Sequence, residues 1–416
     1  MASARTGTAA GGARAALAEP EQPSVLHAGA YHVAVTRALF EAERLDGARL
    51  LAGPAAELAY RELLGVEEEG RVAAAEEVFR TAGLGRLDLS GTGLGGGVVA
   101  VHSSLVAEGW RARHGEAAHP VCATAAGFIA GSMEAAFGRP FEVEEIECSA
   151  HGASPVCLFR ATPAEEGLVP VSERESFDVP ASRAVPADPH PLEARLAAAL
   201  AAPAADAEGR IAGFGVPRSR VWAEYFPRVA YRFERQVPRV MGPKFTNLPA
   251  LVLTEAAHAH GYHGLGGALC SDEWAERVTP LLTTREDWLH AAVALIDSFG
   301  WGVWRVQSIV PGESLSIRVH HSHEALAYRS LHERATAPKC YLARGTAAAL
   351  MNLLYVGDIT ERPEFSGSHY NDLFRSPLSF RAVETRCVAM DDPYCELVVN
   401  PLSPNLGARL RELLER

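Results

Sequence analysis

Two long segments of this chain repeat the same residue pattern at a constant offset, and this repeat restricts the possible folds more than any other feature. His102 aligns with His320 and Cys122 with Cys340, with no gap between the two pairs. The second copy is longer because of an insertion near residues 356–375, after which the alignment resumes. Self-similarity over such a span predicts two copies of one structural module.

The hydrophobic pattern inside each copy predicts helices followed by antiparallel strands. Each copy has a helix that ends at a glycine, then a strand, an alanine-rich helix and two closing strands joined by a turn. We therefore expect an α+β fold in which each module is an antiparallel sheet with helices on one face. The ranges are 72–82, 97–101, the segment after Cys122, 141–148 and 157–161 in the first copy, and 288–299, 314–319, the segment after Cys340, 380–390 and 395–400 in the second.

Composition divides the chain further. The N-terminal segment and the region between the copies are rich in alanine and proline and lack hydrophobic periodicity, which is typical of disordered or connecting chain. Within the connecting region, residues 192–200 fit a short helix. We expect a disordered leader at 1–24, a first module at 25–163, a linker at 164–215, a second module at 216–403 and a C-terminal helical tail at 404–416.

Charge and hydropathy argue against two classes of partner. The net charge is −12 and the lysines and arginines form no block, so direct binding to nucleic acid is not expected. No apolar run reaches the roughly 18 to 20 residues that a membrane-spanning helix needs. The N-terminal segment also lacks the continuous apolar core of a secretory signal. We therefore expect a cytoplasmic protein that does not enter a membrane.

Six of the seven cysteines belong to the repeat, and their pattern is typical of a metal site. In each copy one cysteine precedes the alanine-rich helix, two flank a turn, and a glutamate lies shortly before this pair. Three thiolates and one carboxylate complete a closed, tetrahedral zinc site. Buried cysteines can also simply fill core space, but the same ligand types in the same order in both copies favour metal. The predicted ligands are Cys122, Glu145, Cys148 and Cys157, and Cys340, Glu384, Cys387 and Cys395.

The glutamate of the first copy is assigned by the repeat alone. Glu144, Glu145 and Glu147 all precede Cys148, and only alignment with Glu384 selects Glu145. The seventh cysteine, Cys270, has no counterpart in the first copy, so we interpret it as a buried structural residue rather than a nucleophile.

The cysteine motif and its flanks resemble those of the 4-vinyl reductase domain family. The matching segments are 120–131, 137–140, Glu145-x-x-Cys148, Cys157 and, in the second copy, 383–395. The resemblance covers about residues 26–163 and 216–401. It implies a small-molecule-binding fold, related in architecture to vesicle-tethering subunits, with zinc held by Cys/Glu/Cys/Cys beside an apolar ligand pocket.

This family includes the sensory domains of bacterial aromatic-responsive activators, in which a His and a Trp grip a phenolic hydroxyl. In this chain the segment 101–104 stands near the family's Trp position, so the residue types differ and the ligand can differ too. The chain contains no Walker-type phosphate-binding loop and no basic recognition helix, so it is not such an activator by itself.

Histidines are numerous, and the second copy concentrates them where the family lines its pocket. Glu324 beside His323 could make the imidazole more basic, and a second metal or haem is a further use for such a cluster. Against this, single histidines often cap helices and tryptophans often pack in cores. The predicted ligand-binding residues are His320, His321, His323, Glu324, Tyr328, Trp301 and Trp304, with His102 in the first copy.

Two functions remain open from the sequence. The first is a non-catalytic protein that binds an aromatic or other apolar metabolite in the second module. The second is an enzyme of secondary-metabolite or pigment biosynthesis that uses the same histidine-rich pocket. One copy could also serve as a scaffold for a homodimer.

Overall fold

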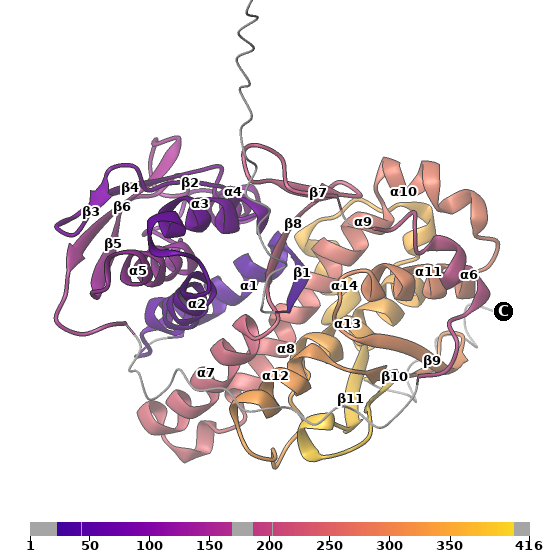
Figure 1. The fold of residues 1–416 in the computed structure, drawn as a ribbon. Helices are drawn as coiled ribbons and strands as arrows, with labels where there is room; N and C mark the ends of the chain where they lie inside the picture. The colour runs from indigo at the N-terminus through magenta and orange to yellow at the C-terminus, as the bar shows by residue number, and fades with distance from the viewer. Residues whose placement is uncertain (1–22, 43, 169–185, 202, 403–416) are drawn as a thin grey trace, which may run out of the picture.

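The computed structural model describes residues 23–42, 44–168, 186–201 and 203–402, which form two halves that lie side by side (Figure 1). Helices and antiparallel strands make up both halves, as expected for an α+β fold. The expected tail and all but the last two residues of the expected leader lie outside the described residues. No helix among those described is long and apolar enough to cross a membrane.

The first half contains a sheet with the strand order β2-β4-β6-β5, and the short strand β3 pairs with β4. Three helices precede most of this sheet, and two more connect β4 to β5. The elements are α2 (Gly47–Leu64), η1 (Glu68–Gly70), α3 (Arg71–Thr81), β2 (Arg86–Asp88), β3 (Thr92–Gly93), β4 (Gly96–His102), α4 (Leu105–His114), α5 (Ala123–Phe137), β5 (Phe141–Glu147) and β6 (Val156–Pro163).

The second half contains a sheet with the order β9-β10-β12-β11, so strands at equal places in the two sequence repeats occupy equal places in the two sheets. Helices again follow the second strand of the order and lead to the edge strand. The elements are α11 (Arg285–Asp297), β9 (Val303–Val310), β10 (Ser314–His320), α12 (His323–Leu331), α13 (Tyr341–Met351), β11 (Phe380–Arg386), η8 (Val388–Met390) and β12 (Cys395–Pro401).

Glycines let the alanine-rich helix of each half approach its neighbour closely. A Cβ atom on Gly127 or Gly131 of α5 would lie 2.0 Å from a backbone carbonyl oxygen of α2, a distance that real Cβ atoms do not reach. In the second half, a Cβ on Gly345 of α13 would lie 2.3 Å from the Cβ of Ala257 on α8 (Leu248–His260). The aligned glycines, 127 and 345, thus have the same role, close helix packing.

The N-terminal strand of each half docks on the other half. Strand β1 (Ser24–Ala28) pairs with β8 (Val216–Trp222), and β7 (Ile211–Gly213) completes this three-stranded sheet. Leu26 N–H donates to Phe299 O (2.8 Å), and Arg220 N–H donates to Ala82 O (2.7 Å). Because 82 and 299 are aligned positions of the repeat, the two halves exchange their first strands symmetrically.

The helices that follow these strands also cross between the halves. Helix α1 (Gly29–Phe40) packs on α8, and α7 (Tyr225–Met241) packs on α2. Arg228 of α7 forms a buried ion pair with Glu57 of α2, and Arg232 contacts the same carboxylate at 3.1 Å. The sheet and these helices join the halves into one core.

The remaining elements lie in the expected linker and in the insertions of the second half. Residues 186–215, expected as linker, contain α6 (Pro191–Leu196) and β7, and α6 packs on α11. The expected short helix is therefore confirmed near its predicted position. The others are η3 (Pro243–Phe245), the π-helix η4 (Gly261–Gly266), α9 (Gly267–Leu269), α10 (Asp272–Arg277), η5 (Thr279–Leu281), the π-helix η6 (Asn352–Val356), η7 (Ile359–Glu361) and α14 (Gly367–Phe374).

Candidate metal centres and ligand cavity

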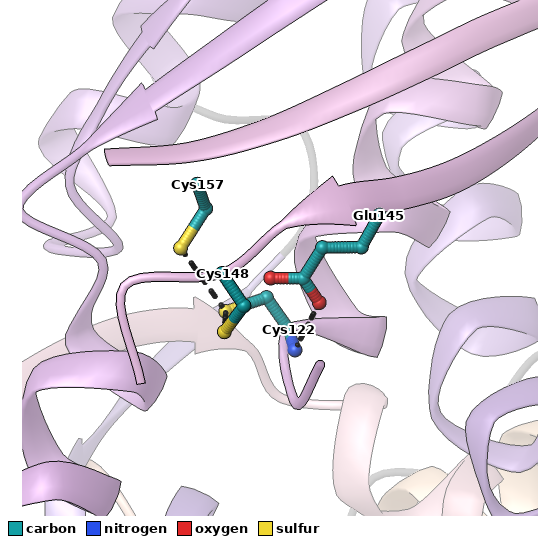
Figure 2. Close-up of side chains that lie close together, drawn as sticks. All are labelled: Cys122, Glu145, Cys148 and Cys157. Atoms are coloured by element: carbon teal, nitrogen blue, oxygen red, sulfur yellow. Dashed lines mark hydrogen bonds between the residues drawn. The ribbon is translucent and has the colours of Figure 1, made fainter. Parts of the chain in front are cut away.

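Four side chains converge at one end of the first sheet (Figure 2). Cys122 immediately precedes α5, Glu145 lies on β5, Cys148 follows that strand, and Cys157 lies on β6. One ligand atom from each lies within 4.8 Å of all the others. Cys122 Sγ is 4.0 Å from Cys148 Sγ and 3.7 Å from Cys157 Sγ, and Glu145 Oε2 accepts a 2.8 Å hydrogen bond from the Cys122 N–H. The structure thus brings the four predicted ligands together.

A β-bulge aligns the glutamate with the cysteine that follows it. In a regular strand Glu145 and Cys148 would face opposite sides, because an odd number of residues separates them. The pairing of β5 with β6 shifts register between Glu145 and Glu147, and this extra residue returns Cys148 to the side of Glu145. Glu144 instead has a side chain that is 71% exposed and lies near Arg160. The geometry therefore selects Glu145 from the three candidates.

The second half repeats this arrangement. Cys340 precedes α13, Glu384 lies on β11 before the same kind of register shift, and Cys395 begins β12. Cys340 Sγ is 3.4 Å from Cys395 Sγ, and Glu384 Oε2 accepts a 3.0 Å hydrogen bond from the Cys340 N–H. With Cys387, these residues form a second group whose ligand atoms lie within 4.8 Å of one another, all buried.

Both groups fit a tetrahedral metal ion. A zinc–sulfur distance of about 2.3 Å places the sulfurs of a tetrahedral site about 3.8 Å apart, close to the separations in the first group. Oε1 of Glu145 and Oε1 of Glu384 are buried without a hydrogen-bond partner. The cysteines are reduced, and burial together with the neighbouring Cys148 raises the pKa of Glu145 to about 8. A bound cation would offset this crowding of buried acids.

The turn before each helix α4 and α12 explains one of the predicted pocket residues. Ser103 and His321 have φ values of 54° and 55°, the left-handed region that chains use in tight turns. The next residue of each turn, Ser104 or Ser322, places its hydroxyl 3.2 to 3.3 Å from the first cysteine of its group. His321 is therefore an exposed turn residue.

The other predicted pocket residues do not lie around one cavity. His320 and Trp304 are buried in the second half, Trp304 fully. Tyr328 packs near Tyr231 on the outer side of α12, and His102 ends β4 in the first half. Glu324 and Tyr328 border a space of about 20 Å³, enough for one water.

Glu324 does not make His323 more basic, which corrects the sequence-based expectation. The Glu324 carboxylate accepts hydrogen bonds from the N–H groups of Leu342 (2.8 Å) and Ala343 (3.0 Å) at the start of α13. Burial lowers the pKa of His323 to about 4. Desolvation therefore outweighs any effect of the neighbouring carboxylate, and His323 is neutral at physiological pH.

His323 instead joins a buried cluster of aromatic and histidine rings that the sequence did not reveal. The ring of His27 on β1 lies 5.7 Å from His323 and 5.7 Å from Trp301, and the ring of His260 lies 5.1 Å from Trp301. Burial lowers the pKa of His27, and lowers that of His260 to about 3. These residues come from both halves, so no local sequence signal marks the cluster.

A large cavity lies between the halves, not inside the second one. Its volume is about 1370 Å³, above the 300 to about 1000 Å³ of common small-molecule pockets. One face each of α1, α4 and α8 lines it, together with parts of α7 and of the segment 365–375, and none of the predicted pocket residues does. The main lining residues are Gly29, Ala30, Val33, Ala34, Arg37 and Ala38 on α1; Leu105, Gly109, Ala112 and Arg113 on α4; and Leu248, Val252, Ala256 and Ala259 on α8.

The helical spacing of this lining explains why the cavity stays open. Positions 30, 34 and 38 on α1 follow one another at intervals of one helical turn, and all three are alanine. Small side chains on facing helices leave space that larger ones would fill. The sequence shows this stripe of small residues, but a stripe of this kind is equally typical of close helix packing.

Comparison with known proteins agrees with the cysteine motif. Residues 98–163 match the model of the 4-vinyl reductase domain. A solved structure titled as the phenol-responsive sensory domain of the transcription activator PoxR with phenol aligns over 50% of this chain and 88% of its own, with 15% identity and a TM-score of 0.35. The search of curated proteins gives no significant match. The part of the chain that holds Cys122, Glu145, Cys148 and Cys157 is therefore a 4-vinyl reductase domain, as the sequence motif predicted.

Proposed function

We propose that this chain is a zinc-containing protein that binds a small, largely apolar molecule in the cavity between its halves. The observation that carries the proposal is the cavity itself, which is bounded by helices from both halves and lined mostly by alanine, valine and leucine. Pockets of this character, with a few polar groups at fixed positions, are typical of small-molecule sites. An aromatic or other apolar metabolite is the class of ligand that such a lining favours.

Zinc in the two cysteine groups would act as a structural link. Each group joins the start of an alanine-rich helix to the closing strand pair of the same half, at Cys122 and Cys340. Four protein ligands leave no open position for water or substrate. Each ion would then hold α5 or α13 in place, and these two helices pack against α2 and α8.

We also propose that the two halves arose by duplication of one module. The equal strand order, the equal place of the cysteine groups and the symmetric exchange of first strands support this. In this arrangement the cavity lies at the junction of two copies, so α1 and α4 of the first copy face α8 of the second. A single copy could not form it.

Blocking the cavity tests the location of the site. The full chain is purified, and the compounds that co-purify are identified by native mass spectrometry and extraction. Ala34→Phe, which adds a ring to the cavity wall, should abolish their retention, while the exposed Ala194→Leu on α6 should not. Retention by Ala34→Phe would reject the cavity as the site.

The same experiment tests the pocket expected from the sequence. His320→Ala and His323→Ala should leave retention unchanged if the ligand lies between the halves, because neither residue lines the cavity. Loss of the ligand in these variants, with zinc content intact, would favour the pocket in the second half. Following the mass of the bound compound over time also tests the alternative that the chain is a biosynthetic enzyme.

A further inference from the structure

One charged side chain in the cavity wall lacks a partner of opposite charge. Arg113 lies in the last turn of α4, half-buried, and its Nη1 donates a 3.2 Å hydrogen bond to the Gly109 carbonyl oxygen. Its Nε is buried and has no hydrogen-bond partner. Among the residues that the structure describes, no carboxylate lies within ion-pair distance of Arg113.

The other strongly charged residues of the lining are paired and lie at the exposed rim. Arg37 contacts Glu41 at 2.6 Å, with side chains 47% and 62% exposed. Arg375 lies 3.5 Å from Glu255 and is 64% exposed. The remaining acid, Glu108, contacts Arg210 at 3.1 Å. These pairs cancel their own charges, so Arg113 alone among these groups brings an uncompensated charge to the wall.

The titratable groups near Arg113 cannot neutralise it. Burial lowers the pKa of His260 to about 3 and that of His263 to about 4, and the positive charge of Arg113 contributes to both. Burial and the nearby arginines, Arg37 first, lower the pKa of His114 as well. Neutral imidazoles carry no negative charge, and a guanidinium stays protonated in proteins. The site is therefore positive and apolar at the same time.

We propose, on the basis of the proposed function, that the ligand is an apolar molecule with one acidic group that pairs with Arg113. Removal of a guanidinium from water is unfavourable unless an anion meets it, and its planar fork matches a carboxylate or phosphate in two hydrogen bonds. The alanine and valine faces of α1 and α8 then hold the apolar body. An organic acid fits this wall better than a phenol, an alcohol or an amine.

The test compares compounds that share an apolar body and differ in one group. Displacement of the neutral fluorescent probe N-phenyl-1-naphthylamine is measured with dodecanoate, dodecyl phosphate, dodecanol and dodecylamine, and with naphthoate against naphthol. We expect the acids to bind at least tenfold more tightly than the alcohol of the same body. Which acid is preferred then separates a carboxylate from a phosphate.

Variants of two arginines assign this preference to one side chain. Arg113→Gln should weaken binding of the acids about 30-fold or more and leave the alcohols unchanged, because truncating a desolvated charge pair has an effect of this size. Arg113→Lys should restore part of the preference. Arg37→Gln, which removes a paired arginine at the rim, should leave it intact. Zinc content and circular dichroism establish that each variant is folded.

The outcomes separate this proposal from the one on which it rests. Equal binding of acids and alcohols by the wild-type protein, or a preference that survives in folded Arg113→Gln, would overturn the acidic ligand while leaving the cavity as a binding site. Probe binding that Ala34→Phe does not reduce would overturn the site itself, and the acidic ligand with it. The wild-type comparison decides the matter even if Arg113→Gln does not fold.

Discussion

Acidification should unfold this protein through four histidines that meet between its halves. Burial lowers the pKa of His32 and His260 to about 3 and that of His323 to about 4, and it lowers the pKa of His27 as well. In the unfolded chain these side chains titrate near pH 6.5. Below pH 6.5 the unfolded chain therefore takes up protons that the folded protein does not, and the equilibrium shifts toward unfolding. The stability is complete above pH 6.5 and declines as the pH falls toward the folded pKa values.

The size of the effect follows from the number of rings. One proton difference changes the free energy of unfolding by about 1.4 kcal/mol per pH unit. At pH 5.5 each histidine has removed about 1.4 kcal/mol, because 5.5 lies one unit below the unfolded pKa and above all the folded values that are known. Four of them together remove roughly 5 to 6 kcal/mol, which is comparable with the whole stability of many domains.

Urea unfolding at pH 7.5 and 5.5, followed by tryptophan fluorescence, measures this loss. Protonation of the cysteine groups also contributes in acid, so the sharper quantity is a difference between variants. His260→Leu removes one buried ring with two unpartnered nitrogens and should reduce the pH-dependent loss by about 1.4 kcal/mol. His119→Gln, a change at an exposed histidine, should not alter it.

The cysteine groups are the same in both variants, so their contribution cancels in the comparison. A wild-type loss below about 1 kcal/mol between the two pH values would refute the reasoning, since even one neutral buried histidine accounts for more. The same conclusion would follow if His260→Leu and His119→Gln depended on pH equally.

Two further predictions concern the metal groups and the helix packing. Elemental analysis should find about two zinc ions per chain, and Cys387→Ala should lose zinc and cooperative unfolding, because the binding energy of structural zinc is folding energy. Cys270→Ala should keep both ions, and a metal-free wild-type protein of full stability would contradict this. Gly131→Ala should destabilise the protein by about 1 to 3 kcal/mol in thermal or urea unfolding, since its Cβ would meet the Ala56 carbonyl oxygen at 2.0 Å. Gly93→Ala, where a Cβ meets nothing within 4 Å, is its control, and equal melting temperatures would disprove the close contact.

The sequence by itself determined the parts of this protein that depend on local pattern and on repetition. The aligned cysteines and glutamates identified both four-residue groups, because a repeated ligand set is visible without a fold. The helix near 72–82 and the strand pair after 141 followed from periodicity and turn residues, which act over a few positions. Even the choice of Glu145 over its neighbours came from the repeat, although the bulge that justifies it is visible only in the structure.

Only the tertiary structure decided where a ligand could bind. The sequence placed polar groups around His320 and His323, but the chain buries His323 against His27 from the other half, and the cavity opens elsewhere. The alanines of α1 predict close packing as readily as an open wall, since what faces them depends on α8, far along the chain. Likewise, whether Arg113 is paired cannot be read from its neighbours in sequence, because electrostatic partners are set by distance in space.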